Sequence, residues 1–268
     1  MNKDRIDVSE LDDDGITWTL LGTLYLRAWE SRLPQPILGD HHAAEAVDRI
    51  DYDFATLAKR LWPQGNQFLV ALRAKRLDEW GADFLTRHPD ATVLQLGCGL
   101  DSRMLRLAPP AGVRWFDLDV PKVVEVRRRL FAEPEGYHLI GASVTDPDWL
   151  GEVPADRPVL VIAEGLFPYL DSEQLRVLLH RLTDRFDTGE LIFDAVAPWI
   201  TRVSKPFRWG TRDGREIERW NPRLRCLARE PFATGYRRIP IPGYRRLFGF
   251  MNATPGLRKA YLELRFGF

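Results

Sequence analysis

Apolar and polar positions form alternating blocks along the middle of the chain. Uninterrupted apolar runs at 92–96 and 159–163 predict strands that are covered on both faces. Leucines spaced three and four residues apart over 172–186 predict an amphipathic helix that packs on such a sheet. Comparable patterns predict further strands at 113–118, 137–141 and 190–196, and helices at 101–107 and 122–131. This repeated alternation predicts an α/β fold, with a mostly parallel sheet and helices on both of its faces.

The N-terminal third has a helical pattern. Residues 1–15 are polar and predict a disordered tail, and apolar positions then recur at helical spacing over 16–30, 42–61 and 66–89. We therefore expect a single domain over 16–268 with a helical cap at 16–89.

The C-terminal part is rich in Arg, Trp, Pro and Gly and has weak periodicity. We expect a cap insertion at about 197–223 within this part. The segments 224–230 and 261–268 alternate between apolar and polar residues, so they predict two strands that pair at the edge of the sheet.

The length and the residue types narrow the class of protein. A chain of 268 residues suits one α/β domain with a cap. No apolar run approaches the roughly 20 residues of a membrane-spanning helix, so we expect no membrane partner. The acidic N-terminus lacks the apolar stretch of a signal peptide. Cys98 and Cys226 lack the spacing of a metal site or a disulfide framework, and together these features predict a cytoplasmic protein.

The charge is balanced over the whole chain but is unevenly placed. Residues 1–60 hold seven Lys and Arg against twelve Asp and Glu, and residues 200–268 hold sixteen against five. Such asymmetry is compatible with a nucleic-acid partner. However, the arginines are interspersed with Pro, Trp and Phe and form no continuous basic block. A solvated basic surface is the simpler interpretation, and we do not expect a nucleic-acid partner.

Two neighbouring strands end in residues suited to binding a nucleoside. Gly97 and Gly99 follow the first strand, where glycine lets the backbone approach a ligand. Asp119 ends the second strand, where a carboxylate can accept hydrogen bonds from both ribose hydroxyls, whereas Asp117 is expected to be structural. Asp101 would place a negative charge where a dinucleotide carries phosphates. This charge argues against NAD and favours a cationic nucleoside such as S-adenosylmethionine.

Three segments of the sequence carry a resemblance to a known family. They are VLQLGCGLDSRMLRL, WFDLDVPKVVEVRRRL and VIAEGLFPYLDSEQLRVLL, which begin at residues 93, 115 and 161. Together they resemble the leucine carboxyl methyltransferase family, and more closely its bacterial branch that contains polyketide O-methyltransferases. The similarity covers most of 16–268. It implies a class I methyltransferase fold, which has a seven-stranded, mostly parallel sheet and a helical cap and which uses S-adenosylmethionine.

The resemblance also assigns roles to residues of the cofactor site. It places Gly97 beneath the methionine part of S-adenosylmethionine and Asp119 at its ribose hydroxyls. It further places Arg73 at the cofactor carboxylate, with Arg76 as a competitor. Glu164 is expected to face the cofactor and the reacting centre, and the alternative is a strand-end carboxylate that pairs with a nearby arginine. A guanidinium suits the role given to Arg73, because it binds a carboxylate through two parallel hydrogen bonds.

One position departs from the family pattern. The leucine carboxyl methyltransferases have Asp-Leu near the adenine, and the matching pair here is Ser143-Val144. Ser143 can hydrogen-bond the adenine only as a neutral group. Asp146 is the alternative contact if the chain shifts slightly.

The chemistry of methyl transfer sets the remaining expectations. The reaction is a displacement that needs orientation and a dry site, and we expect no metal. A carboxylate acceptor needs no base, whereas a hydroxyl acceptor does, and His41 and His42 are the obvious candidates. Solvent-facing histidines are the simpler interpretation of that pair. Tyr169 is expected to border the transferred methyl group.

The acceptor is expected to lie between the N-terminal helix and the insertion. The candidate residues are aromatic: Tyr25, Trp199, Phe207, Trp209 and Trp220. The tryptophans and Phe207 fit a flat apolar slot for an aromatic substrate, although the core of the cap is the favoured interpretation.

Four functions compete for this sequence. The leading one is an O-methyltransferase that acts on a carboxylate or hydroxyl of a small molecule, for example a polyketide-like metabolite. The alternatives are a protein C-terminal carboxyl methyltransferase, a catalytically degenerate scaffold and a nucleic-acid methyltransferase. The motif Asp/Asn-Pro-Pro-aromatic, which serves amino groups of bases, is absent from the sequence, which argues against the last alternative. The oligomeric state is left open, a homodimer included.

Overall fold

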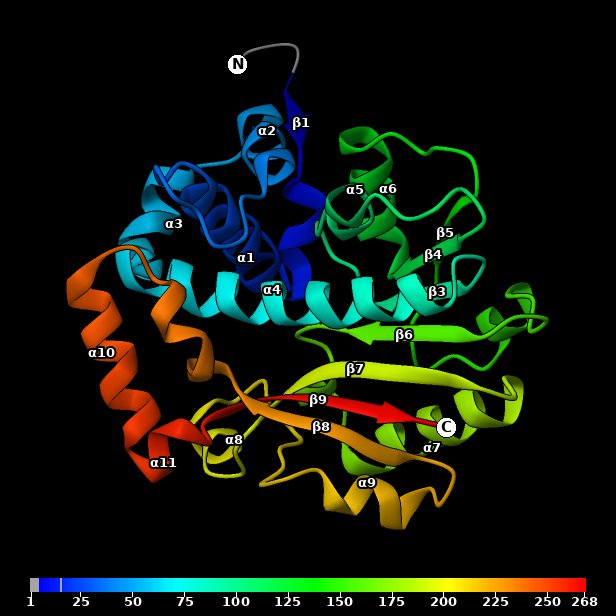
Figure 1. The fold of residues 1–268 in the computed structure, drawn as a ribbon. Coiled ribbons are helices and arrows are strands. Elements are labelled where there is room, and N and C mark those ends of the chain that lie inside the picture. The colour runs from blue at the N-terminus through cyan, green and yellow to red at the C-terminus, as the bar shows by residue number, and fades with distance from the viewer. Residues whose placement is uncertain (1–4, 15) are drawn as a thin grey trace.

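A seven-stranded sheet forms the centre of the protein (Figure 1). The structure is a computed structural model and describes residues 5–14 and 16–268. The strands, in the order in which they lie side by side, are β5 (Tyr137–Gly141), β4 (Arg114–Asp119), β3 (Thr92–Leu96), β6 (Val159–Ala163), β7 (Gly189–Val196), β9 (Tyr261–Gly267) and β8 (Arg225–Pro231).

The direction of the strands creates the place where a ligand can bind. The pairs from β5 to β7 are parallel, whereas β9 runs antiparallel to both β7 and β8. The chain proceeds from β3 outward to β5 and then returns to β6 on the other side of β3. In sheets of this type, ligands bind at the carboxyl ends of the strands where the order reverses. The predicted α/β class and the predicted edge pair of β8 and β9 are confirmed.

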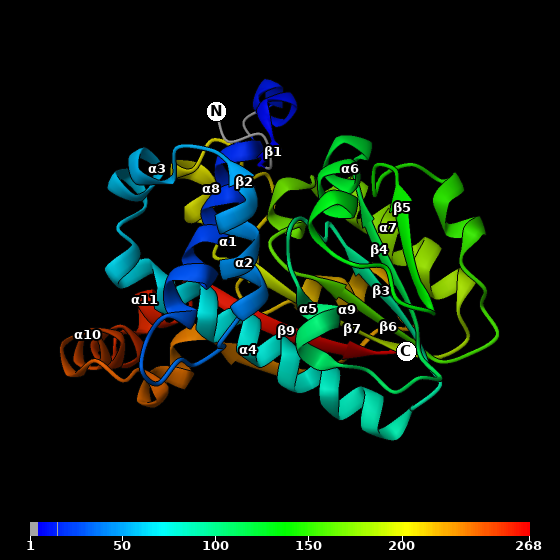
Figure 2. The same cartoon turned by 90° about the horizontal axis from the view of Figure 1, so that it is seen from above.

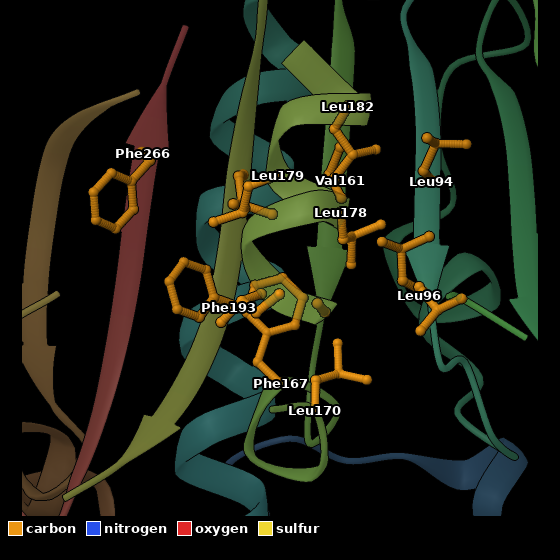
Figure 3. Close-up of a cluster of buried hydrophobic side chains, with 14 of the residues drawn as sticks. Leu94, Leu96, Val161, Phe167, Leu170, Leu178, Leu179, Leu182, Phe193 and Phe266 are labelled. Carbon is orange, nitrogen blue, oxygen red and sulfur yellow. The ribbon is translucent and has the colours of Figure 1, made fainter. Parts of the chain in front are cut away.

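Helices cover both faces of the sheet (Figure 2). One face packs against α7 (Ser172–Arg185), whose leucine stripe belongs to a cluster with apolar side chains of six strands. Figure 3 shows this cluster: Leu94, Leu96, Val161, Phe167, Leu170, Leu178, Leu179, Leu182, Phe193 and Phe266. The other face packs against α4 (Pro63–Arg87) and α5 (Arg103–Leu107). The central strands are therefore buried on both sides, as their continuous apolar runs predicted.

The N-terminal helices form a second apolar core beside the sheet. They are α1 (Ile16–Ser31), α2 (His41–Arg49) and α3 (Phe54–Leu61), and they pack with α6 (Pro121–Leu130). The helix predicted over 42–61 is divided in two, because β2 (Ile50–Asp51) separates α2 from α3.

The prediction of a disordered tail over 1–15 is wrong for the described residues in it. Strand β1 (Ile6–Asp7) pairs with β2, and the 3-10 helix η1 (Ser9–Asp14) follows it. Ile6, Val8 and Leu11 are buried in the N-terminal core, so three apolar residues among polar ones suffice to fix this segment. Residues 1–4 and 15 lie outside the described residues.

The remaining segments are short helices around the strand ends. They are η2 (Asp148–Glu152), η3 (Phe167–Tyr169), α8 (Ile200–Val203), α9 (Arg215–Trp220), η4 (Phe232–Arg238), α10 (Pro242–Ala253) and α11 (Pro255–Arg258). The segment expected as a cap insertion, 197–223, carries α8 and α9, and Ile217 of α9 belongs to the same core as α7. No helix in the described part of the chain is long and apolar enough to cross a membrane.

Candidate active site

A cavity of about 570 Å³ lies at the carboxyl ends of β3, β4, β6 and β7. Its volume falls within the roughly 300–1,000 Å³ of small-molecule sites. The lining comes from two groups of segments: the turn after β3 with the ends of β4 and β5, and α1 with the start of α4 and η3. We name these the donor end and the acceptor end. The donor end is lined by Gly97, Cys98, Gly99, Leu118, Asp119, Ala142, Ser143 and Val144.

Two glycines shape the turn after β3, and their backbone conformation favours glycine. Gly97 has φ +61° and Gly99 has φ +52°. A Cβ on Gly97 would lie 3.0 Å from Leu166 Cδ1, and a Cβ on Gly99 would lie 2.9 Å from Leu20 Cδ1. A side chain at either position would therefore be strained and would also displace the wall of the cavity.

Asp119 is held at the donor end by the backbone. Its Oδ2 accepts a hydrogen bond from the N–H of Gly99 at 2.7 Å, and its Oδ1 accepts one from Val120 at 2.8 Å. Burial raises the pKa of Asp119, although both N–H groups act against that rise. Asp117, by contrast, is fully buried and accepts hydrogen bonds from Tyr137 and Arg127. The expected structural role of Asp117 is confirmed.

Glu164 and Asp194 lie next to each other and share Arg73. The Nε of Arg73 donates to Glu164 at 2.9 Å, and its Nη1 donates to Asp194 at 3.3 Å. Arg103 forms a second ion pair with Glu164. Burial by itself raises the pKa of Glu164, but Arg73 and Arg103 outweigh burial, so the pKa of Glu164 is lowered. Burial does prevail at Asp194, whose pKa is raised.

Asp101 lines the cavity but its charge is already neutralised. Arg106 contacts its carboxylate at 2.6 Å and Arg103 contacts it at 3.1 Å. Burial raises the pKa of Asp101, and Arg103 and Arg106 overcome that effect and bring it well below the usual value. The expectation that Asp101 presents a free negative charge to the ligand is therefore corrected, and the electrostatic argument against NAD loses its basis.

The turn after β5 closes the donor end. Ser143 and Val144 line the cavity, as the comparison with the family pattern predicts. Asp146 is exposed and its carboxylate accepts a hydrogen bond from the N–H of Ser143 at 3.2 Å. Asp146 thus holds the turn and does not itself line the cavity.

The acceptor end is mainly apolar and aromatic. Trp18, Tyr169, Phe207 and Tyr261 line it, together with Leu61. Tyr169 meets Phe207 edge to face, with ring centroids 5.1 Å apart. Burial raises the pKa of both tyrosines, so both phenols stay protonated near neutral pH. The predicted contributions of Tyr169 and Phe207 to this region agree with the lining of the cavity.

Two histidines and one tyrosine that the sequence analysis assigned to the site lie outside this cavity. His41 and His42 line a separate cavity of about 310 Å³ between α2 and α4, because Asp40 begins α2 on that side. Tyr25 is buried in the N-terminal core and stacks on Phe54 at 5.4 Å. His41 as the base and Tyr25 as an acceptor contact are therefore corrected.

The two tryptophans of the insertion are also placed elsewhere. Trp209 is 4% exposed and packs between Phe193 and Trp220 in the core beside α7. Trp199 is 47% exposed and does not line the cavity. The apolar slot predicted from these tryptophans is thus wrong, and the favoured interpretation as core holds for Trp209 and Trp220.

Sequence reasoning missed two residues of the site. Asp194 lies near the end of β7, and the rule that located Asp119 and Glu164 would have found it, since all three lie at or near the ends of parallel strands. Tyr261 begins β9, which is antiparallel, so its first residue lies at the edge where its neighbours end. No local pattern in the sequence indicates that reversal.

The sheet order, with an antiparallel strand between β7 and β8 and a ligand cavity after β3, defines a class I methyltransferase fold. A crystal structure of a candidate methyltransferase from Thermobifida fusca shares this fold, with a TM-score of 0.59 at 16% identity over 90% of this chain and 93% of that chain. The family model of the leucine carboxyl methyltransferases matches residues 21–183. The chain belongs to the leucine carboxyl methyltransferase family.

Two relatives align over nearly the whole chain. The tetracenomycin polyketide synthesis O-methyltransferase TcmP of Streptomyces glaucescens is 42% identical over 269 residues, which cover 95% of this chain and 97% of TcmP. The S-adenosyl-L-methionine-dependent methyltransferase dpfgK of Gibberella zeae is 36% identical over 279 residues, which cover 94% of this chain and 93% of dpfgK. The resemblance stated from the three sequence segments is thereby confirmed.

Proposed function

We propose that this enzyme transfers a methyl group from S-adenosylmethionine to a carboxylate or hydroxyl oxygen of an aromatic, polyketide-like small molecule. The protein is an S-adenosylmethionine-dependent methyltransferase. The observation that carries the proposal on the acceptor is the form of the cavity. One continuous space joins a glycine turn and a strand-end carboxylate to a wall of aromatic side chains.

The donor end fits S-adenosylmethionine through features of the protein itself. Gly97 and Gly99 leave room where any Cβ would intrude, so the backbone is open to close approach by a ligand. Asp119 keeps its carboxylate at the cavity wall, where we assign it to the ribose hydroxyls. Ser143 and Val144 are assigned to the adenine, and Arg73 to the cofactor carboxylate.

When bound, S-adenosylmethionine supplies a methyl group on a cationic sulfur, which an oxygen nucleophile attacks. The residues of the chain contribute orientation, charge and exclusion of water. Glu164 stays ionised because Arg73 and Arg103 lower its pKa, so Glu164 is suited to electrostatic stabilisation and poorly suited to accept a proton. The apolar side chains of the acceptor end contribute the exclusion of water.

The acceptor end favours a flat, largely apolar molecule. Trp18, Phe207 and Tyr261 offer ring surfaces, and aromatic pairs add stability beyond the area that they bury. For a hydroxyl acceptor, Asp194 replaces His41 as the candidate proton acceptor, because it lines the cavity and has a raised pKa. For a carboxylate acceptor no proton transfer is required. TcmP, named for an O-methylation in polyketide synthesis, supports this substrate class.

Calorimetric titration with S-adenosylhomocysteine is the first test of the donor end. We expect wild-type protein to bind it and Asp119→Ala to bind at least about tenfold more weakly, because the two ribose hydrogen bonds are lost. NAD serves as the negative control. Equal binding by wild type and Asp119→Ala would refute the role assigned to Asp119.

An acceptor screen then tests the substrate class. Deuterated S-adenosylmethionine and mass spectrometry would report transfer to polycyclic phenols, aromatic carboxylic acids and a peptide with a C-terminal leucine. We expect transfer to aromatic small molecules and none to the peptide. Transfer to the peptide alone would replace the proposal with protein carboxyl methylation.

A further inference from the structure

Three consecutive backbone carbonyls after β3 are held by buried arginines. Arg127 of α6 donates to Gly99 O at 3.1 Å and to Asp101 O at 2.7 Å. Arg27 of α1 donates to the carbonyl between them, Leu100 O, at 3.1 Å. Because peptide groups are planar and trans, fixing three successive carbonyls also fixes the N–H groups that follow them. We name residues 97–101 the donor loop.

The two arginines reach the donor loop from different parts of the fold. Arg127 belongs to a helix that packs beside the sheet and is anchored by Asp117 of β4. Arg27 belongs to α1 and itself lines the cavity, as do the earlier α1 residues Trp18, Thr19 and Gly22. Arg27 therefore connects the donor loop to the helix that forms part of the acceptor wall.

Arg27 is itself fixed by carboxylates. It is 4% exposed, its Nε lies 3.2 Å from Asp40 Oδ2, and the same nitrogen lies 3.9 Å from Asp101. The contact with Asp40 is an ion pair, and the hydrogen bonds that Asp40 accepts include those from Ser102 and from the N–H of Ala43 in the first turn of α2. The guanidinium thus spans a loop carbonyl on one side and the first turn of a cap helix on the other. The planar guanidinium of arginine suits this geometry, whereas the flexible ammonium group of lysine does not.

We propose that Arg27 is a positioning residue that couples the donor loop to α1, so that binding of the methyl donor orders the wall of the acceptor end. The inference rests on the proposed assignment of the donor end to S-adenosylmethionine. Arg27 acts through Leu100 and Asp40, and its effect on the acceptor side is transmitted by α1.

Substitution of Arg27 is compatible with folding because its carboxylate partners have another cation. Arg106 Nη1 lies 2.9 Å from Asp40 and 2.6 Å from Asp101, so neither carboxylate is left without a counter-charge. Arg49 of α2 offers a matched control. It also donates to backbone carbonyls, those of Arg129 and Leu130, but it does not line the cavity.

The test compares Arg27→Met, Arg27→Lys and the control Arg49→Met by titration with S-adenosylhomocysteine. We expect affinity to fall about tenfold in both Arg27 variants and to stay within about twofold of wild type in Arg49→Met. Full rescue by lysine would overturn the proposal, since it would show that positive charge without the fork suffices. An unchanged affinity in Arg27→Met would overturn it equally.

Hydrogen exchange at saturating S-adenosylhomocysteine distinguishes the proposed coupling from a purely structural role of Arg27. A purely structural role would not change the protection that the ligand gives to α1. In wild type we expect ligand to protect the backbone amides of both the donor loop and α1. In Arg27→Met we expect protection to remain at the loop and to be lost at α1. Equal protection of α1 in both proteins would refute the coupling. Failure of wild type to bind S-adenosylhomocysteine would refute the proposed donor end and, with it, the inference.

Discussion

Two neighbouring carboxyl groups that share one arginine have pKa values shifted in opposite directions. Glu164 faces both Arg73 and Arg103, whereas Asp194 shares only Arg73, and their side chains are 7% and 3% exposed. The second cation makes the difference, since it lowers the pKa of Glu164 while burial raises that of Asp194. Pairs of carboxyl groups with separated pKa values are typical of sites where one group stays ionised and the other exchanges a proton.

Replacing Gly97 with alanine should disable the donor end. The backbone at φ +61° disfavours any Cβ, and that Cβ would approach Leu166 Cδ1 to 3.0 Å. We expect the affinity for S-adenosylhomocysteine to fall at least about tenfold and the free energy of unfolding to fall by about 1–2 kcal/mol. Gly151→Ala is the control, because a Cβ there meets nothing within 4 Å. Similar titration curves for Gly97→Ala and Gly151→Ala would contradict the prediction.

The burial of Glu263 predicts that the stability of the fold depends on pH. The residue is 1% exposed, its Oε1 accepts no hydrogen bond within the described structure, and burial raises its pKa well above 4.5. The folded state therefore keeps the proton after the unfolded state has lost it, so this group lowers stability progressively as the pH rises above about 4.5.

Glu263→Gln removes that ionisation while keeping the shape of the side chain. We expect the variant to gain about 1–2 kcal/mol relative to wild type between pH 5 and pH 7, measured by urea unfolding at each pH. A difference that does not change with pH would show that Glu263 is ionised in the folded protein.

The first turn of α7 stabilises the helix that covers one face of the sheet. Asp171 accepts hydrogen bonds from the N–H groups of Glu173 and Gln174, and the Gln174 side chain accepts one from the N–H of Asp171. This capping box satisfies backbone donors that would otherwise lack partners.

Asp171→Ala should cost about 1 kcal/mol of unfolding free energy without changing the affinity for S-adenosylhomocysteine, because α7 lies on the face away from α4 and α5. Asp184→Ala, on the exposed side of the same helix, should change stability by less than about 0.5 kcal/mol. Equal stability losses in the two variants would argue against the cap as the cause.

The strands and the donor end were predictable from the sequence because both are marked by patterns of a few consecutive residues. A buried strand followed by glycine or aspartate is visible in a few residues, as at Gly97 and Asp119. The acceptor end was not predictable in this way. Tyr261 reaches the cavity through the reversal of β9, and Trp209 is withdrawn into the core by its contact with Phe193. His41 sits on the far side of the Asp40 and Arg106 ion pairs, which no spacing in the sequence reveals.

For the whole molecule, ligand binding should appear as thermal stabilisation. A ligand that binds only the folded state at 100 times its Kd adds about 2.7 kcal/mol to the free energy of unfolding. We expect S-adenosylhomocysteine at that excess to raise the Tm by about 5 °C, and NAD to leave it unchanged. Differential scanning calorimetry would check this, and an equal shift with NAD would contradict the assignment of the donor end.

The cavity draws its two ends from separate stretches of the chain. The lining of the donor end comes from 97–144, whereas Trp18, Leu61, Phe207 and Tyr261 bring the acceptor wall from four distant segments. Substitutions of these four side chains replace neither the glycines of the turn nor Asp119. The architecture therefore lets substrate preference diversify while the methyl-donating machinery is retained, and a directed library at these four positions would exploit that separation.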